Sequence, residues 1–239
     1  NGIEDYTATF GYDYSTAVPA VPPAPNGGGN TVGVLPTVNK DDTNALGAAG
    51  VNLYPAGQSF SGDHALRFDM CLLKNDVSGT TEHALFGLNC SGNLTNWFRY
   101  SPDSGPVPGG HAFDGLWCQV VADASGAYGD YVLNSAPADD QLPTAYGSQA
   151  ASALTGIFKS PPYRLAGSPA SEAFSLTVDP VWAEVELAFV GGQVTLKINN
   201  TIVISEANTT AFTSGNLMLG YNDSWDSIGN AGGGVIYDN

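Results

Sequence analysis

The feature that most constrains the fold is a hairpin pattern between residues 181 and 205. Gly191-Gly192 suits a two-residue turn, because glycine tolerates the positive φ that such turns need. Pairing outward from this turn sets apolar residues opposite one another on one face: Phe189 with Val194, Leu187 with Leu196, and Val185 with Ile198. On the other face Glu186 falls opposite Lys197, a favourable cross-strand charge pair. Both faces therefore predict the same register.

The rest of the chain also alternates short strand-like runs with turn residues. Gly (30) and Pro (15) are frequent, which favours tight turns over long helices. Only residues 148–154, within a less regular stretch from 134 to 171, suggest a short helix. This pattern predicts an all-β sandwich or barrel. The predicted strands are 6–14, 31–39, 50–54, 64–73, 82–90, 96–100, 116–122, 128–133, 173–178, 181–190, 193–199, 202–205, 216–221 and 234–238.

The organisation of the chain favours a single domain over residues 1–239. The Pro- and Gly-rich stretch from Pro19 to Asn30 is interpreted as an extended surface crossing and not as an interdomain linker. The last residues stop inside a predicted strand, so we expect a longer parent chain.

The charge balance excludes several partners. The 7 Lys and Arg residues against 23 Asp and Glu give a net charge of −16, which repels nucleic acid phosphates and anionic membranes. No apolar run approaches the length of a membrane-spanning helix, so we expect a soluble chain without membrane insertion. The low lysine content and the Ser-, Thr- and Asn-rich strands are typical of secreted or cell-surface proteins.

The cysteines, Cys71, Cys90 and Cys118, all lie in apolar segments. Their spacing matches no zinc pattern, and cysteine is frequently a small buried hydrophobic residue. We expect buried thiols, with one disulfide as the alternative.

Several segments together resemble the concanavalin A-like lectin and glucanase domains, including their laminin G-like members. They are the meander 182–203, the closing segments 215–223 and 235–239, and the segment 61–69. The resemblance implies a two-sheet antiparallel jelly-roll β-sandwich. It does not fix the function, because this fold hosts lectins, adhesion modules, glycosidases and lyases.

The catalytic motif of the glucanases in that group, Glu-x-Asp-x-Glu, is absent from this sequence. The nearest substitute is Glu184-Val-Glu186, which we interpret as a solvated outer face because Lys197 lies opposite Glu186. His64, His83 and His111 lack the Arg-, Gln- and Tyr-containing strands of lyases with a similar fold. We therefore expect a non-catalytic protein, and an enzyme acting on polysaccharide is the less favoured alternative.

Calcium is the one cofactor that the sequence suggests. Ca²⁺ takes six to eight oxygen ligands, and acidic residues are concentrated near the end of the chain. For a loop between the closing strands, beside an opening strand that carries Asp13, an Asx-type turn that caps itself by hydrogen bonds is the favoured interpretation, and a structural calcium site is the alternative hypothesis. The candidate ligands are Asn222, Asp223, Asp226 and Asp238.

A carbohydrate-binding module of an extracellular protein is the favoured function, with a polysaccharide or glycan as its partner. Sugar rings stack on aromatic faces, and polar groups fix their hydroxyls. The candidate contacts are Trp97, Arg99, Tyr128, Tyr131 and Trp225. For each aromatic residue among them, packing in the core or at a strand edge is the favoured alternative, and Trp117 and Trp182 are predicted in the core. The alternative is a structural or assembly module of a surface layer, adhesin or filament that binds other protein modules.

Overall fold

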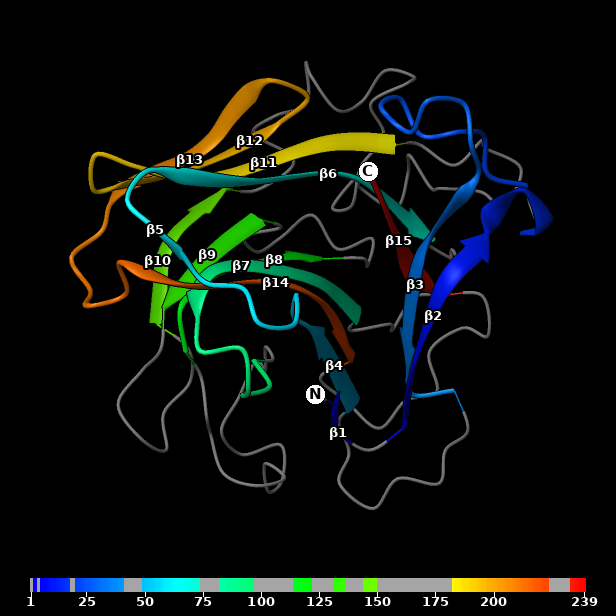
Figure 1. Ribbon diagram of the computed structural model, residues 1–239, viewed down its shortest axis with the longest axis horizontal. Helices are drawn as coiled ribbons and strands as arrows, with labels where there is room; N and C mark the ends of the chain where they lie inside the picture. Colours follow the sequence, from blue (N-terminus) through cyan, green and yellow to red (C-terminus); the bar gives the residue numbers. More distant parts are fainter. Residues whose placement is uncertain are drawn as a thin grey trace.

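The computed structural model describes residues 2–3, 5–17, 20–40, 49–73, 82–96, 114–121, 131–135, 144–149, 182–223 and 233–239. These residues form two antiparallel β-sheets that pack face to face (Figure 1). No helix in these ranges is long and apolar enough to cross a membrane.

Sheet A has the strand order β1-β4-β14-β7-β8-β9-β10, and a short strand, β5, pairs with the start of β14. All its pairs are antiparallel. Its strands are β1 (Gly2–Ile3), β4 (Ala49–Leu53), β5 (Phe60–Ser61), β7 (Glu82–Cys90), β8 (Leu116–Val121), β9 (Tyr131–Ser135), β10 (Thr144–Gln149) and β14 (Ser214–Asp223).

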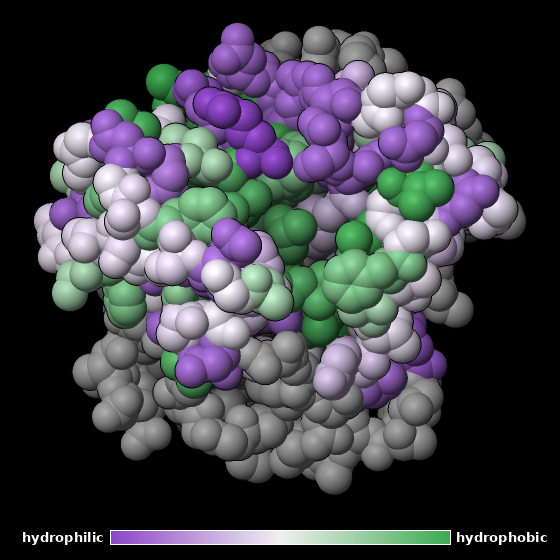
Figure 2. Space-filling model, viewed as in Figure 1, coloured by the Kyte–Doolittle hydropathy of each residue, from purple (hydrophilic) through white to green (hydrophobic). Residues whose placement is uncertain are grey.

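Sheet B has the strand order β13-β12-β11-β6-β15-β3-β2. Its strands are β2 (Tyr6–Asp13), β3 (Val32–Val38), β6 (His64–Leu73), β11 (Trp182–Val190), β12 (Gln193–Ile198), β13 (Thr201–Ala207) and β15 (Gly234–Asp238). A single 3₁₀ turn, η1 (Tyr14–Thr16), follows β2. In the view of Figure 1, hydrophilic side chains gather along the upper edge over β6 and β11, and apolar ones gather in a hollow between the sheets (Figure 2).

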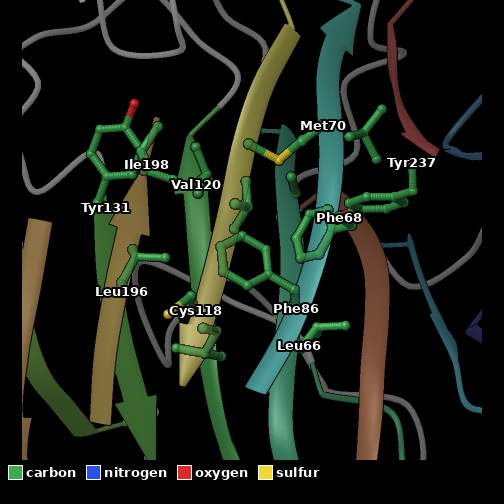
Figure 3. Packing of buried hydrophobic residues seen from close by; sticks show 14 of the residues in the cluster. Leu66, Phe68, Met70, Phe86, Cys118, Val120, Tyr131, Leu196, Ile198 and Tyr237 are labelled. Atoms are coloured by element: carbon green, nitrogen blue, oxygen red, sulfur yellow. The ribbon is translucent and has the colours of Figure 1, made fainter. Parts of the chain in front are cut away.

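The core lies between the inner faces of the two sheets (Figure 3). Phe68 of sheet B packs edge-on against Phe86 of sheet A at 5.2 Å between ring centroids, and against Tyr237 at 5.3 Å. The Tyr237 hydroxyl also donates across the sandwich to the backbone oxygens of Gly220, at 2.7 Å, and Leu85, at 3.0 Å. Burying each such ring contributes roughly 1.5–3 kcal/mol, so this interface holds the two sheets together.

The predicted two-sheet antiparallel sandwich is confirmed. The hairpin register is confirmed residue by residue, with Gly191 and Gly192 at φ of 56° and 79°. All three cysteines are free and buried, as expected, and Trp117 and Trp182 are buried as well. The short helix expected at 148–154 is wrong at its start, because residues 148 and 149 belong to strand β10.

A second, smaller apolar cluster covers one end of the outer face of sheet B. It joins outward-facing Cys71, Trp182 and Ile236 to Tyr14 and to the segment 20–30, which we call the strap. The Trp182 Nε1 donates to the Pro22 oxygen at 2.7 Å, and the Trp182 ring meets the Tyr14 ring edge-on at 5.2 Å. The surface crossing predicted from the Pro-rich sequence is thus confirmed, and it docks on sheet B.

Candidate functional site

The outer face of sheet B carries three successive rows of side chains, because cross-strand partners share a face and every second residue points outward. The register of β11, β6, β15 and β12 defines them. The apolar row is Trp182, Cys71 and Ile236; the acidic row is Glu184, Asp69 and Asp238; the charge-paired row is Lys197, Glu186 and Arg67. The strap covers the apolar row, and its edge reaches the acidic row.

In the charge-paired row one carboxylate holds two cations. Glu186 accepts from Lys197 Nζ at 2.8 Å and from Arg67 Nε at 2.6 Å. These two hydrogen bonds, that of Lys197 first, lower the pKa of the Glu186 carboxyl below its ordinary value of 4.5. The Arg67 side chain is 72% exposed, so the row presents charged groups to solvent in a fixed arrangement.

In the acidic row three carboxylates lie on neighbouring strands, and no cation among the described residues pairs with them. Like charges placed directly opposite each other are destabilising. The strap and Tyr14 compensate for this with hydrogen-bond donors. Asn26 donates its backbone N–H and its side-chain amide to Asp69, at 2.8 and 2.9 Å, and the same amide to Glu184 at 2.8 Å. The Tyr14 hydroxyl donates to Asp238 at 2.8 Å.

Asp69 is fully buried at the centre of the acidic row. This burial raises the pKa of the Asp69 carboxyl above its ordinary value of 3.8; the Asn26 hydrogen bonds oppose the rise, and the charges of Glu184 and Asp238 add to it. Asp69 is therefore an anchor for the strap, whereas Glu184 is exposed and can meet a ligand.

A polar groove with a cavity volume of about 390 Å³ runs along the charge-paired row and reaches Glu184 of the acidic row. Its walls offer carboxylates, amides, a guanidinium and an ammonium group, and all of them except Asn239 lie on strands, a turn or the anchored strap. The lining residues are Asn26, Arg67, Phe68, Glu184, Val185, Glu186, Lys197, Asn200 and Asn239. The site can therefore both donate and accept hydrogen bonds.

A second cavity, the apolar cleft, has a volume of about 470 Å³ and opens between the sheets (Figure 2). Its polar groups already have protein partners: the Tyr54 hydroxyl donates to the Leu94 oxygen at 2.7 Å, and Asn52 accepts from the Asn96 backbone N–H. The cleft is thus a poorer place for a ligand rich in hydroxyls. Its apolar lining includes Phe10, Val34, Leu53, Leu66, Leu217 and Leu219.

One of the five predicted sugar contacts belongs to the described residues. Tyr131 is buried in the main core, so its ring cannot stack on a sugar, and that prediction is wrong (Figure 3). The other four, Trp97, Arg99, Tyr128 and Trp225, lie outside the described residues.

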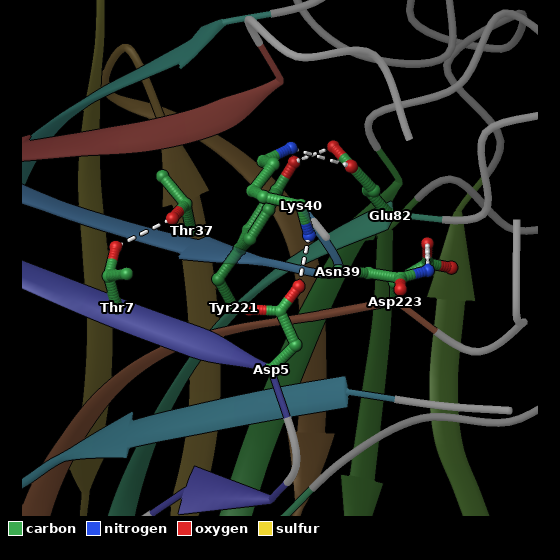
Figure 4. Close-up of polar contacts among 8 residues, drawn as sticks. All are labelled: Asp5, Thr7, Thr37, Asn39, Lys40, Glu82, Tyr221 and Asp223. Atoms are coloured by element: carbon green, nitrogen blue, oxygen red, sulfur yellow. Dashed lines mark hydrogen bonds and ion pairs between the residues drawn. The ribbon is translucent and has the colours of Figure 1, made fainter. Parts of the chain in front are cut away.

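The three predicted calcium ligands that belong to the described residues do not all lie together. Asn222 and Asp223 are not in a loop but are buried in strand β14, where Asp223 accepts from the Asn39 amide at 3.0 Å (Figure 4). Asp223 pairs with Glu82, whose carboxylate packs against Gly233. Asp238 lies five residues after Gly233, near the other end of β15, and a strand rises about 3.3 Å per residue. Asp238 is therefore far from Asp223 and belongs to the acidic row.

Two further parts of that calcium hypothesis can be placed. The opening strand β2 does not lie beside β15 as expected, because β3 lies between them. Asp226 is outside the described residues. In the described part of the chain no three His, Cys, Asp or Glu side chains are grouped to hold a metal ion.

Sequence reasoning found only part of this site. It placed Glu184 and Glu186 on a polar outer face with Lys197, and the structure confirms that arrangement. It missed Arg67 and Asn26. The alternation in Leu66-Arg67-Phe68-Asp69 could have indicated Arg67, because it places the two charged side chains on one face of the strand and the two apolar side chains on the other.

No protein-family model and no curated protein matches this sequence. Several solved structures are similar to this chain at low sequence identity. A protein of unknown function with a galectin-like fold from Bacillus subtilis is 11% identical, with 99% of this chain and 87% of that chain covered and a TM-score of 0.49. The carbohydrate-binding module CBM66 from Bacillus subtilis is 10% identical, with 87% and 89% covered and a TM-score of 0.40.

The metal-free carbohydrate recognition domain of Emp46p is 10% identical, with 98% of this chain and 84% of that chain covered and a TM-score of 0.44. At these identities the likeness concerns the fold alone. The two-sheet antiparallel sandwich itself is established by the strand order of this chain.

Proposed function

We propose that this protein is a non-catalytic carbohydrate-binding module, and that its glycan lies in the polar groove on the outer face of sheet B. The observation that carries the proposal is the composition of the groove walls: carboxylates, amides and cations fixed in place by paired strands and the anchored strap. Sugar hydroxyls both donate and accept hydrogen bonds, so this mixture complements them. Groups held in place before binding lose little conformational entropy when the ligand binds.

The electrostatics of the groove favour binding over catalysis. A glycosidase needs one carboxyl group that holds a proton, normally through a raised pKa, and a second one free to act. In the groove, Glu186 has a lowered pKa and bonds two cations. The Asp69 carboxyl has a raised pKa, but both its oxygens accept hydrogen bonds from Asn26.

A glycan array followed by calorimetry tests the proposal. We expect Arg67→Ala and Glu186→Ala to weaken binding of an array-selected oligosaccharide about tenfold or more, since a hydrogen bond to a charged group contributes about 1.5–3 kcal/mol. Phe10→Ser in the apolar cleft is the matched control, because Phe10 is 69% exposed and lies away from the groove. Unchanged affinity in both groove variants contradicts the proposed site. Running the array with calcium and with chelator tests the calcium prediction, which rests on the sequence alone.

The alternative, an assembly module, is favoured by a different observation. Among the described residues the edge strand β2 pairs only with β3, and it exposes Tyr6 (43%) and Phe10 (69%). Exposed apolar edge strands are sites where another strand can add. Sedimentation equilibrium showing self-association that Phe10→Ser abolishes would support this function; a monomer at all concentrations contradicts it.

A further inference from the structure

The charges around the groove are unequal, and this inequality bears on which glycans it accepts. Two cations, Arg67 and Lys197, occupy the charge-paired row, and both contact Glu186. The groove itself is lined by these two cations and by two carboxylates, Glu184 and Glu186. Asp69 and Asp238 belong to the acidic row beside it, so the two rows together carry two negative charges more than positive ones. The chain as a whole carries −16.

Both cations share one carboxylate partner, Glu186, so the charge-paired row keeps one positive charge, whereas the acidic row carries three negative charges. The Glu186 carboxylate lies 2.6 Å from Arg67 Nε and 2.8 Å from Lys197 Nζ, so an incoming anion meets a cation that already has a carboxylate partner. Binding that anion also brings it close to Glu186 itself. Glu184, by contrast, is exposed in the groove and accepts a hydrogen bond from an uncharged amide, that of Asn26.

We infer that the groove selects glycans by charge: it takes uncharged sugars and sugars with free amino groups, and it rejects uronates and sulfated sugars. This inference rests on the proposed function, because it concerns the same groove. An ammonium group near Glu184 gains an attraction that a hydroxyl does not, and a uronate near the same residue meets repulsion. The negative field of the whole chain acts in the same direction on the approach of a charged polymer.

A matched series of β-1,4-linked hexasaccharides isolates the effect of charge: glucose (neutral), glucosamine (cationic) and glucuronate (anionic). We expect affinity in the order glucosamine, glucose, glucuronate, with the difference between the charged members shrinking when salt is raised from about 50 to about 500 mM. If this backbone does not bind, the neutral, amino and acidic members of the array-selected linkage replace it. Tighter binding of the acidic member overturns the inference and leaves the carbohydrate-binding function intact. No binding of any glycan overturns both.

Two variants connect the selectivity to the groove. Glu184→Gln is expected to lower the preference for the amino sugar over the acidic one about fivefold, because one unpaired charge is removed at contact distance. Glu184→Lys is expected to reverse the order. Glu206→Gln on β13 changes the net charge of the chain by the same amount; Glu206 pairs with core residue Val194 and so belongs to the other side of sheet B. Equal shifts in Glu184→Gln and Glu206→Gln contradict a role for the groove.

Discussion

The acidic row and the charge-paired row lie two residues apart on the same strands, yet they use charge in opposite ways. At the centre of the acidic row, Asp69 is buried and surrounded by other carboxylates, and its pKa is raised. At the centre of the charge-paired row, Glu186 lies between two cations, and its pKa is lowered. One row therefore attaches the strap to the sheet, and the other presents charge to solvent.

The difference shows how one sheet face can serve both structure and binding. A buried carboxylate requires donors, and the strap supplies them to Asp69 through Asn26. That attachment fixes Asn26 as one wall of the groove. The exposed row beside it contributes little to stability, so its side chains are available for a ligand.

The largest effect on stability is expected from Asp69→Ala. It leaves the Asn26 donors without their carboxylate, and we expect the free energy of unfolding to fall by about 2–4 kcal/mol, since bonds to charged groups contribute about 1.5–3 kcal/mol each. Urea unfolding measures the loss. The matched control is Arg67→Ala in the exposed row, where a change within about 1 kcal/mol is expected. If the free energy of unfolding fell equally in the two variants, the acidic row would not contribute more to stability than the charge-paired row.

The two rows are expected to depend on pH with opposite signs. The folded pKa of Asp69 lies above 3.8, so its contribution to stability is complete below that pH and is lost as pH rises through the folded value. The folded pKa of Glu186 lies below 4.5, so its contribution is present above that pH and is lost as pH falls through the folded value.

Paired variants measure these signs by urea unfolding between about pH 3 and about pH 7. Relative to the unsubstituted protein, Asp69→Asn should become more stable as pH rises, and Glu186→Gln should become less stable. We expect each difference to change by about 1 kcal/mol or less across the range, because Glu186 is partly exposed. If the stability differences of the two variants changed in the same direction with pH, the opposite pKa shifts of Asp69 and Glu186 would be contradicted.

The smallest effect concerns the coupling inside the acidic row. Glu184→Gln removes a like charge directly opposite Asp69, so the pKa of Asp69 should move down toward its ordinary value. NMR titration of the Asp69 side-chain carboxyl carbon measures this shift. Glu206→Gln should leave the titration unchanged, and an unchanged titration in Glu184→Gln would show that the two carboxylates do not interact.

Local parts of this molecule could be predicted from the sequence, and distant pairings could not. The turn at Gly191-Gly192 and the polar face with Glu186 and Lys197 follow from residues a few positions apart. The contact between Arg67 and Glu186 joins strands more than a hundred residues apart in the chain, so no local pattern reveals it. The docking of the strap on Asp69 was hidden for the same reason.

Burial was the other source of error. Tyr131 was predicted as a candidate sugar contact, but strand β9 lies within sheet A, and the core encloses its ring. Asn222 and Asp223 suggested a loop because they are polar; in the structure they end a buried strand, where Asn39 satisfies Asp223. Calcium binding and the extracellular location stay predictions from the sequence.

The most direct test of a glycan site on sheet B is a backbone amide NMR titration of the labelled protein with an oligosaccharide selected on the array. The groove predicts that the perturbed amides cluster on the central strands and the strap, at residues 26, 67–69, 184–186 and 197–200. Amides around Phe10, Leu53 and Leu217 in the apolar cleft should stay unperturbed. Perturbations centred on the cleft, with none along the two rows, would contradict the account.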